Sequence, residues 1–128
     1  MFSAPQITLY SKDIRRALAF WGGLGFAEVF RYAPAGEPVH VELALDGFRL
    51  GIADVAAARA DHGLEPNLDG QAIEVVLWCT DTDVAYAKLT AAGAPVLSRP
   101  HDWLDDLRLA WVADPDGNPI QLVSRRAT

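Results

Sequence analysis

Short runs in which polar and apolar residues alternate recur along the chain, and this period-2 pattern predicts β-strands. The first run covers residues 6–10, where Gln6, Thr8 and Tyr10 alternate with Ile7 and Leu9. Two other segments carry apolar residues at helical spacing. These residues are Ile14, Ala17, Leu18 and Trp21 in the first segment, and Val84, Ala87 and Leu89 in the second. An Asp precedes each segment and a Gly follows it, as is typical of helix N-caps and helix ends.

The two halves of the chain repeat one succession of elements. Residues 6–13 (QITLYSKD) align with residues 74–81 (EVVLWCTD) at an offset of 68, and residues 46–52 (DGFRLGI) align with residues 116–122 (DGNPIQL) at an offset of 70. Asp-Gly between β-like runs predicts a hairpin turn in each half. The other predicted strands cover residues 26–32, 39–45, 95–98 and 107–113. Each half is therefore predicted to have the order β-α-β-β-β.

This repeat predicts one α+β domain over residues 1–128, built from two modules. The modules span about residues 4–54 and 71–126, and a linker of about residues 55–70 joins them. An Ala-rich short helix opens the linker and a polar stretch follows it. Because each module holds only about 60 residues, neither is expected to be stable alone.

Two motifs carry a family resemblance. Residues 12–26 (KDIRRALAFWGGLGF) and 112–122 (VADPDGNPIQL) resemble the vicinal oxygen chelate superfamily, which includes glyoxalase I, bleomycin-resistance proteins, extradiol dioxygenases and fosfomycin-resistance enzymes. The family usually has Phe-Tyr before Leu-Gly-Phe, whereas this chain has Phe20-Trp21. The resemblance implies two βαβββ modules that form a curved eight-stranded mixed sheet around a cavity. It also implies a homodimer.

The resemblance further implies four metal-ligand positions, on the first and last strand of each module. They fall on Gln6, Gly51, Glu74 and Gln121, with Val75 replacing Glu74 if the register slips by one residue. Metal enzymes of the family use His and Glu there, whereas this set has no His, two weakly ligating amides and a glycine without a side chain. We therefore expect no metal cofactor. The alternative is a divalent metal held by Glu74 together with ligands from elsewhere.

Strand alternation also predicts which side chains face the cavity. We expect alternate residues of the first strand of each module to face the cavity, together with one residue of the last strand of the second module. They are Gln6, Thr8, Tyr10, Glu74, Val76, Trp78 and Gln121. Two amides and a carboxylate on a concave wall suit hydrogen bonding to a ligand, and Glu74 can pair with a cation.

Five further residues are candidates for ligand contact. His40 and Glu42 lie two apart on one predicted strand, so they share a face, either as a pocket pair or as part of a solvated surface. His101 and Trp103 lie in residues 99–103, a predicted loop that either borders the cavity mouth or is ordinary surface. Trp111 lies on the penultimate strand, and the sequence leaves its direction open.

Three residues are expected to have no direct part in the site. Trp21 occupies the family's aromatic position on the first helix, and the resemblance implies that it lies in the core. His62 in the linker is predicted to be solvated, and Cys79 to be a buried apolar residue.

Composition and charge limit the classes of partner that the chain is expected to bind. The chain has a net charge of −6, which argues against a nucleic-acid partner and permits a cationic ligand. With one cysteine, no long apolar run and no basic, apolar leader, we expect no disulfide framework, no membrane partner and a cytoplasmic location. Four tryptophans suit either a core or an aromatic ligand wall.

The sequence therefore predicts a metal-independent small-molecule binding protein that sequesters an aromatic or cationic ligand. The alternative is a metal-dependent lyase, isomerase or dioxygenase of the same superfamily, with His40, Glu42 or His101 as further ligands.

Overall fold

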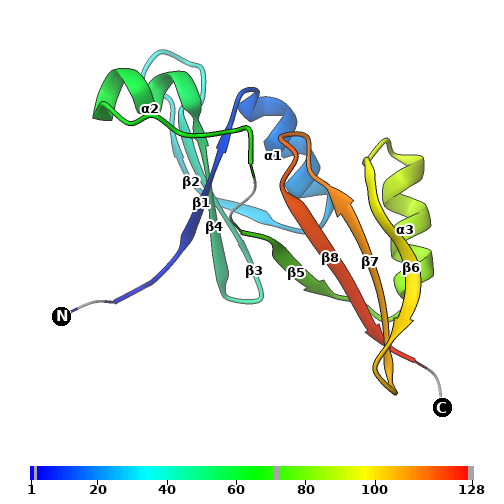
Figure 1. Ribbon diagram of the computed structural model, residues 1–128. Helices are drawn as coiled ribbons and strands as arrows, with labels where there is room; N and C mark the ends of the chain where they lie inside the picture. Colours follow the sequence, from blue (N-terminus) through cyan, green and yellow to red (C-terminus); the bar gives the residue numbers. More distant parts are fainter. Residues whose placement is uncertain (2, 71–72, 127–128) are drawn as a thin grey trace. The chain divides into compact units, whose positions relative to one another are not determined.

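A computed structural model describes residues 1, 3–70 and 73–126, and it divides the chain into two compact units, Met1–Asp69 and Gly70–Thr128 (Figure 1). Each unit is considered by itself. The predicted start of the second module, near residue 71, lies outside the described residues. Within the described part of the chain, no helix is long and apolar enough to cross a membrane.

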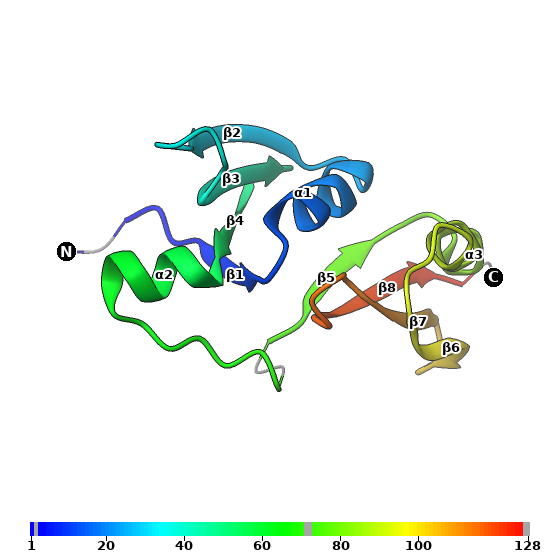
Figure 2. The same ribbon diagram turned by 90° about the horizontal axis from the view of Figure 1, so that it is seen from above.

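The first unit has a four-stranded sheet and two helices. Its elements are β1 (Ile7–Ser11), α1 (Ile14–Gly23), β2 (Ala27–Tyr32), β3 (His40–Leu45), β4 (Phe48–Asp54) and α2 (Val55–His62). The strand order is β1-β4-β3-β2, with β1 parallel to β4 and the other neighbours antiparallel. Figure 2 shows α2 continuing directly from the end of β4.

The second unit repeats this topology, and its described residues contain no counterpart of α2. Its elements are β5 (Val75–Trp78), α3 (Thr82–Ala91), β6 (Val96–Trp103), β7 (Leu107–Ala113) and β8 (Pro119–Arg125). The strand order is β5-β8-β7-β6, again with the first and last strands parallel. The predicted α+β fold of two βαβββ modules is confirmed, with its eight strands found as two mixed four-stranded sheets.

The helices begin where the sequence predicts. Asp13, Asp54 and Asp81 are the N-caps of α1, α2 and α3, and each carboxylate accepts a hydrogen bond from the backbone N–H three residues later. In the first hairpin, Asp46 and Gly47 have φ values of 50° and 80°. A type I′ turn requires positive φ at both central residues, so the hairpin turn predicted from Asp-Gly is found here.

The second hairpin is closed by a buried carboxylate. Asp114 Oδ1 accepts hydrogen bonds from the backbone N–H groups of Asp116 (2.9 Å) and Asn118 (2.7 Å), and Oδ2 accepts one from Asn118 Nδ2 (2.8 Å). Burial raises the pKa of the Asp114 carboxyl, against the opposing effect of these hydrogen bonds. The carboxylate therefore fixes the turn of residues 114–118 between β7 and β8.

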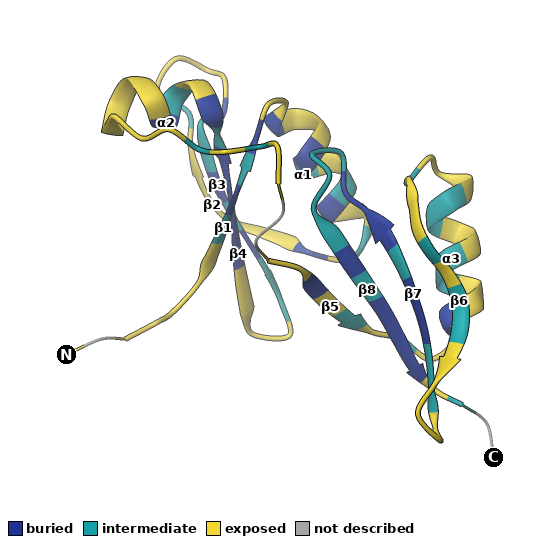
Figure 3. Cartoon of the chain, viewed as in Figure 1, coloured by how far each residue is buried: buried dark blue, intermediate teal, exposed yellow. Residues whose placement is uncertain are grey.

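The core of the first unit lies between α1 and the sheet. Trp21 is fully buried and makes T-shaped contacts with Phe20 and Phe26, at centroid distances of 5.5 and 5.4 Å. Leu50 and Ile52 of β4 are buried in the same unit. The core position predicted for Trp21 is confirmed. Figure 3 shows that β2, in contrast, is exposed along its whole length.

Two local predictions for the second unit are wrong. The inward stripe of α3 consists of Thr82, Ala85, Tyr86 and Leu89, whereas Val84 and Ala87 are exposed. Residues 99–103 belong to β6 and do not form a loop. β6 is an edge strand, where a proline at position 100 is tolerated because no neighbour needs its missing N–H, and register shifts absorb the irregularity.

Trp21→Ala should lower the free energy of unfolding by about 3–5 kcal/mol, because it removes a large buried ring and leaves a cavity. Trp78→Ala is the matched control, since Trp78 is 60% exposed and loses only a ring contact with Arg125, worth less than about 1 kcal/mol. Urea unfolding followed by circular dichroism measures both. Equal losses in the two variants would contradict the assigned core.

Candidate functional site

The first unit contains a pocket of about 690 Å³ on one face of its sheet, bordered by α2. Its aromatic and imidazole rings are Tyr10, Phe30, Tyr32, His40 and His62. Its carboxylates are Asp54 and Asp61, and Thr8, Pro34, Val39, Ala53, Ala57, Ala58 and Leu64 complete the wall. We call it the unit-1 pocket.

Strand register brings these rings to one face. Tyr10 lies opposite Ala53, Ala53 lies opposite His40, and His40 lies opposite Tyr32. Directly opposed residues on neighbouring strands point to the same side of a sheet. Because Ala53 is small, space remains between the rings of Tyr10 and His40.

Glu42 anchors a polar cluster beside the pocket. Its carboxylate accepts hydrogen bonds from His40 Nε2 (3.2 Å), Gln6 Nε2 (3.3 Å) and Arg49 Nη1 (2.9 Å). The bond from His40, and then those from Gln6 and Arg49, lower the pKa of the Glu42 carboxyl, although partial burial opposes them. The structure thus brings together three residues predicted from the sequence.

The second unit gathers another set of predicted residues. The rings of His101 and Trp111 are stacked, with centroids 6.0 Å apart and planes at 18°. Trp111 Nε1 donates a hydrogen bond to Glu74 Oε2 over 2.9 Å. His101, Trp103, Trp111 and Gln121 line a cavity of about 410 Å³ with Leu107 and Leu109. We call this set the Trp111 cluster, and it gives Trp111 the direction that the sequence left open.

The remaining predictions have mixed outcomes. Thr8, Tyr10 and His40 line the unit-1 pocket. Val76 and Trp78 are exposed and line neither cavity. The Arg125 guanidinium lies over the Trp78 ring, 5.3 Å from its centroid. Cys79 is half-buried, with its Sγ 3.5 Å from the Val123 carbonyl oxygen.

Sequence reasoning missed part of the pocket. His62 is exposed as predicted, yet it lines the pocket. Phe30 and Tyr32 were placed on a strand without a facing direction, although their shared parity was visible in the sequence. No local signal indicates Asp61, because its place in the wall depends on where α2 packs.

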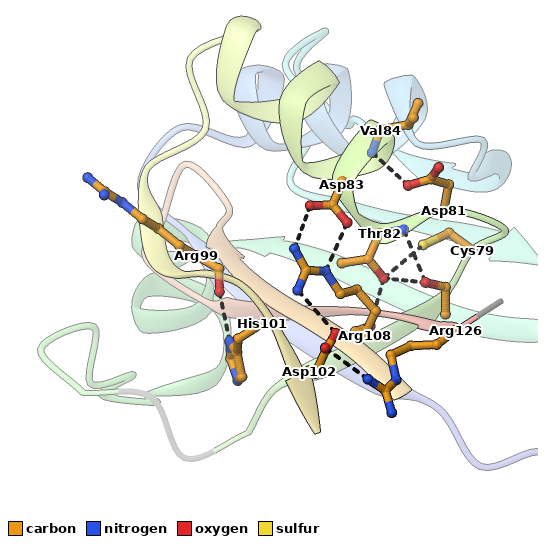
Figure 4. Close-up of polar contacts among 11 residues, drawn as sticks. Cys79, Asp81, Thr82, Asp83, Val84, Arg99, His101, Asp102, Arg108 and Arg126 are labelled. Atoms are coloured by element: carbon orange, nitrogen blue, oxygen red, sulfur yellow. Dashed lines mark hydrogen bonds and ion pairs between the residues drawn. The ribbon is translucent and has the colours of Figure 1, made fainter. Parts of the chain in front are cut away.

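A polar network occupies the side of the second unit where α3 begins (Figure 4). Arg108 forms two hydrogen bonds of 2.9 Å with Asp83 and one of 3.1 Å with Asp102, which also pairs with Arg126. Buried Thr82 donates to the Arg108 carbonyl oxygen over 2.7 Å and lies 2.7 Å from Ser124 Oγ. These bonds join α3 to β6, β7 and β8, so we assign the network a structural role.

The sequence model of the Glyoxalase/Bleomycin resistance protein/Dioxygenase superfamily matches residues 3–122. The chain belongs to this superfamily. Comparison with curated proteins gives no match.

Solved structures of the superfamily have the same fold. A glyoxalase-related enzyme from Fulvimarina pelagi is 23% identical, with a TM-score of 0.78 over 96% of this chain and 88% of its own. A superfamily member from Sphaerobacter thermophilus DSM 20745 is 26% identical, with a TM-score of 0.72 over 96% and 98%. Lactoylglutathione lyase from Agrobacterium tumefaciens is 23% identical, with a TM-score of 0.66 over 97% and 95%.

The four residues at the metal-ligand positions that the resemblance implies form a poor ligand set for a divalent ion. Gly51 offers no ligand, and a Cβ at this position would lie 2.7 Å from Thr8 Oγ1. Gln6 and Gln121 are neutral amides, and one oxygen of Glu74 already accepts the Trp111 hydrogen bond. Among the residues that the structure describes, no three His, Cys, Asp or Glu side chains are grouped to hold a metal.

Glu42→Gln should reduce the pH dependence of stability. Because the native pKa lies below the ordinary value of 4.5, ionised Glu42 stabilises the fold above about pH 4.5, and this stabilisation is lost as the pH falls through the native pKa. Urea unfolding at several pH values should show a deficit in the variant near neutrality that narrows in acid. Glu65→Gln is the control, since that carboxylate is 83% exposed. A deficit that is constant with pH would contradict the assignment.

Proposed function

We propose that this superfamily member binds a small planar aromatic molecule without a metal, and that it prefers a cation. The observation that carries the proposal is the unit-1 pocket, whose wall combines aromatic rings with carboxylates. Its volume of about 690 Å³ falls within the usual range of ligand pockets, about 300–1,000 Å³.

The rings favour a flat ligand. Tyr10, Phe30 and Tyr32 present apolar faces on which an aromatic molecule can stack, and the Tyr hydroxyls can hydrogen-bond polar substituents. Phe30 and Tyr32 are about half exposed in the free protein, so a ligand that covers them removes apolar surface from water.

The carboxylates favour a positive charge. Asp61 lies on the pocket wall near the end of α2, while Asp54 is engaged as the N-cap of that helix. Glu42 is held by three donors and is therefore less available to a ligand. Asp61 is thus the carboxylate that we assign to a cationic ligand, with attraction from the net charge of −6.

We also propose the second unit as a ligand surface. The Trp111 cluster offers two indole rings and an imidazole, with Gln121 as a hydrogen-bonding group and Glu74 as a nearby negative charge. Val76 and Trp78 have exposed apolar side chains on the same sheet. The homodimer and the cytoplasmic location remain predictions of the same proposal.

Isothermal titration calorimetry with three probes of similar shape tests the charge preference. We expect 1-methylquinolinium to bind more tightly than neutral quinoline, and 1-naphthalenesulfonate to bind least. Asp61→Asn should weaken the cation about 2- to 5-fold, as expected for a partly exposed ion pair of about 0.5–1 kcal/mol.

Asp69→Asn is the matched control, because it makes the same charge change at an exposed site outside the pocket. An equal effect of both substitutions on the cation would remove Asp61 from the site. The absence of heat with all three probes would refute the binding proposal.

Metal removal tests the other half of the proposal. Dialysis against a chelator should leave the affinity for 1-methylquinolinium unchanged, and elemental analysis should find less than one divalent ion per chain. A stoichiometric divalent ion whose removal abolishes binding would instead support a metal-dependent lyase, isomerase or dioxygenase.

A further inference from the structure

The unit-1 pocket contains an imidazole backed by a carboxylate. The His40 ring lines the pocket, and its Nε2 lies 3.2 Å from Glu42 Oε2. In the described part of the chain, His40 Nδ1 has no hydrogen-bond partner. Both side chains are partly shielded from water, since His40 is 32% exposed and Glu42 is 17% exposed.

We propose that His40 is a general base for proton abstraction from a planar carbon acid bound in the unit-1 pocket, and that Glu42 is its positioning residue. This inference rests on the proposed function, because the same pocket must accept a planar aromatic molecule. It adds a reaction to what was proposed as binding alone.

The hydrogen bonds around Glu42 determine which nitrogen is basic. The donors Gln6 and Arg49 hold the carboxylate in place, and the lowered pKa keeps it ionised at neutral pH. An ionised carboxylate accepts a hydrogen bond but cannot donate one, so Nε2 of the neutral His40 ring carries the hydrogen. The lone pair is then on Nδ1. The carboxylate also stabilises the imidazolium that forms when Nδ1 takes up a proton.

The surroundings of the ring suit a flat substrate. Phe30 lies beside His40, with ring centroids 6.2 Å apart and planes at 59°. Small Ala53 lies opposite His40 on β4 and leaves room for a ligand. Other titratable or charged groups come from β1, β2, β4 and α2. Arg49 contacts Glu42, and the groups that line the same pocket are Tyr10, Tyr32, Asp54, Asp61 and His62.

A simple elimination tests this chemistry without a known substrate. In 5-nitrobenzisoxazole, His40 Nδ1 takes the proton from C3 and the C–H electron pair forms a nitrile. The ring N–O bond breaks with its electron pair on oxygen, which gives the coloured 2-cyano-4-nitrophenolate, after which the imidazolium returns its proton to water. The reaction needs no metal, oxidant or co-reactant, and its rate depends directly on the base.

The wild-type chain should accelerate this reaction with saturation. His40→Ala should lower kcat about 100-fold, the lower end of the range for general base catalysis. Added imidazole should restore the rate in this variant. Glu42→Gln should lower kcat more than it changes KM, because it disturbs the orientation of the base and leaves the pocket wall intact.

Further measurements separate the outcomes. Rescue by added imidazole should be confined to His40→Ala, and rescue of His62→Gln in its place would reassign the base to His62. Unchanged kcat in His40→Ala would overturn the proposal and leave Asp54 or Asp61 as the base. Circular dichroism verifies that each variant is folded.

Binding of quinoline, measured in parallel, distinguishes this inference from the proposed function. Quinoline binding without turnover would overturn the assignment of His40 as a general base and would leave the binding function unaffected. Absence of turnover together with absence of heat from all three probes would overturn both.

Discussion

Parallel pairing of the first and last strands of each module is the constraint on which the candidate sites depend. In the first unit it aligns Tyr10 with Ala53, and the antiparallel β3 then aligns His40 with the same alanine. A shift of one residue would turn every side chain of β1 to the opposite face and would bury Thr8 and Tyr10 under the helix. The pocket is therefore a product of register as much as of residue type.

The topology could be predicted from the sequence because local signals mark each element. Strand alternation, Asp N-caps and Asp-Gly turns are local signals, and the chain carries them twice at nearly constant offset. Tyr10 and His40 were identified as site candidates because parity within a single strand is sufficient to group them with their neighbours. Helical spacing groups Trp21 with Ile14 and Ala17, and the family resemblance implies that this aromatic position lies in the core.

The features that could not be predicted depend on contacts between elements that are distant in the sequence. The direction of Trp111 follows from its pairing with Gln121, and Asp61 joins the pocket only because α2 packs beside the sheet. The extent of β6 depends on register shifts that accommodate residues 99–103, which have a loop-like composition. The inward stripe of α3 begins at Thr82, a polar residue that can be buried because its hydroxyl is hydrogen-bonded to Ser124 and to a backbone carbonyl.

Gly51 also limits how this chain can change. The Cβ of any other residue at this position would approach Thr8 Oγ1 to 2.7 Å, far inside normal contact distance. A mutation that placed a histidine or glutamate at position 51 would therefore require the Thr8 side chain to rotate away or to be replaced by a smaller one. A substitution at Gly51 is thus coupled energetically to Thr8, and made on its own it would carry a cost in stability.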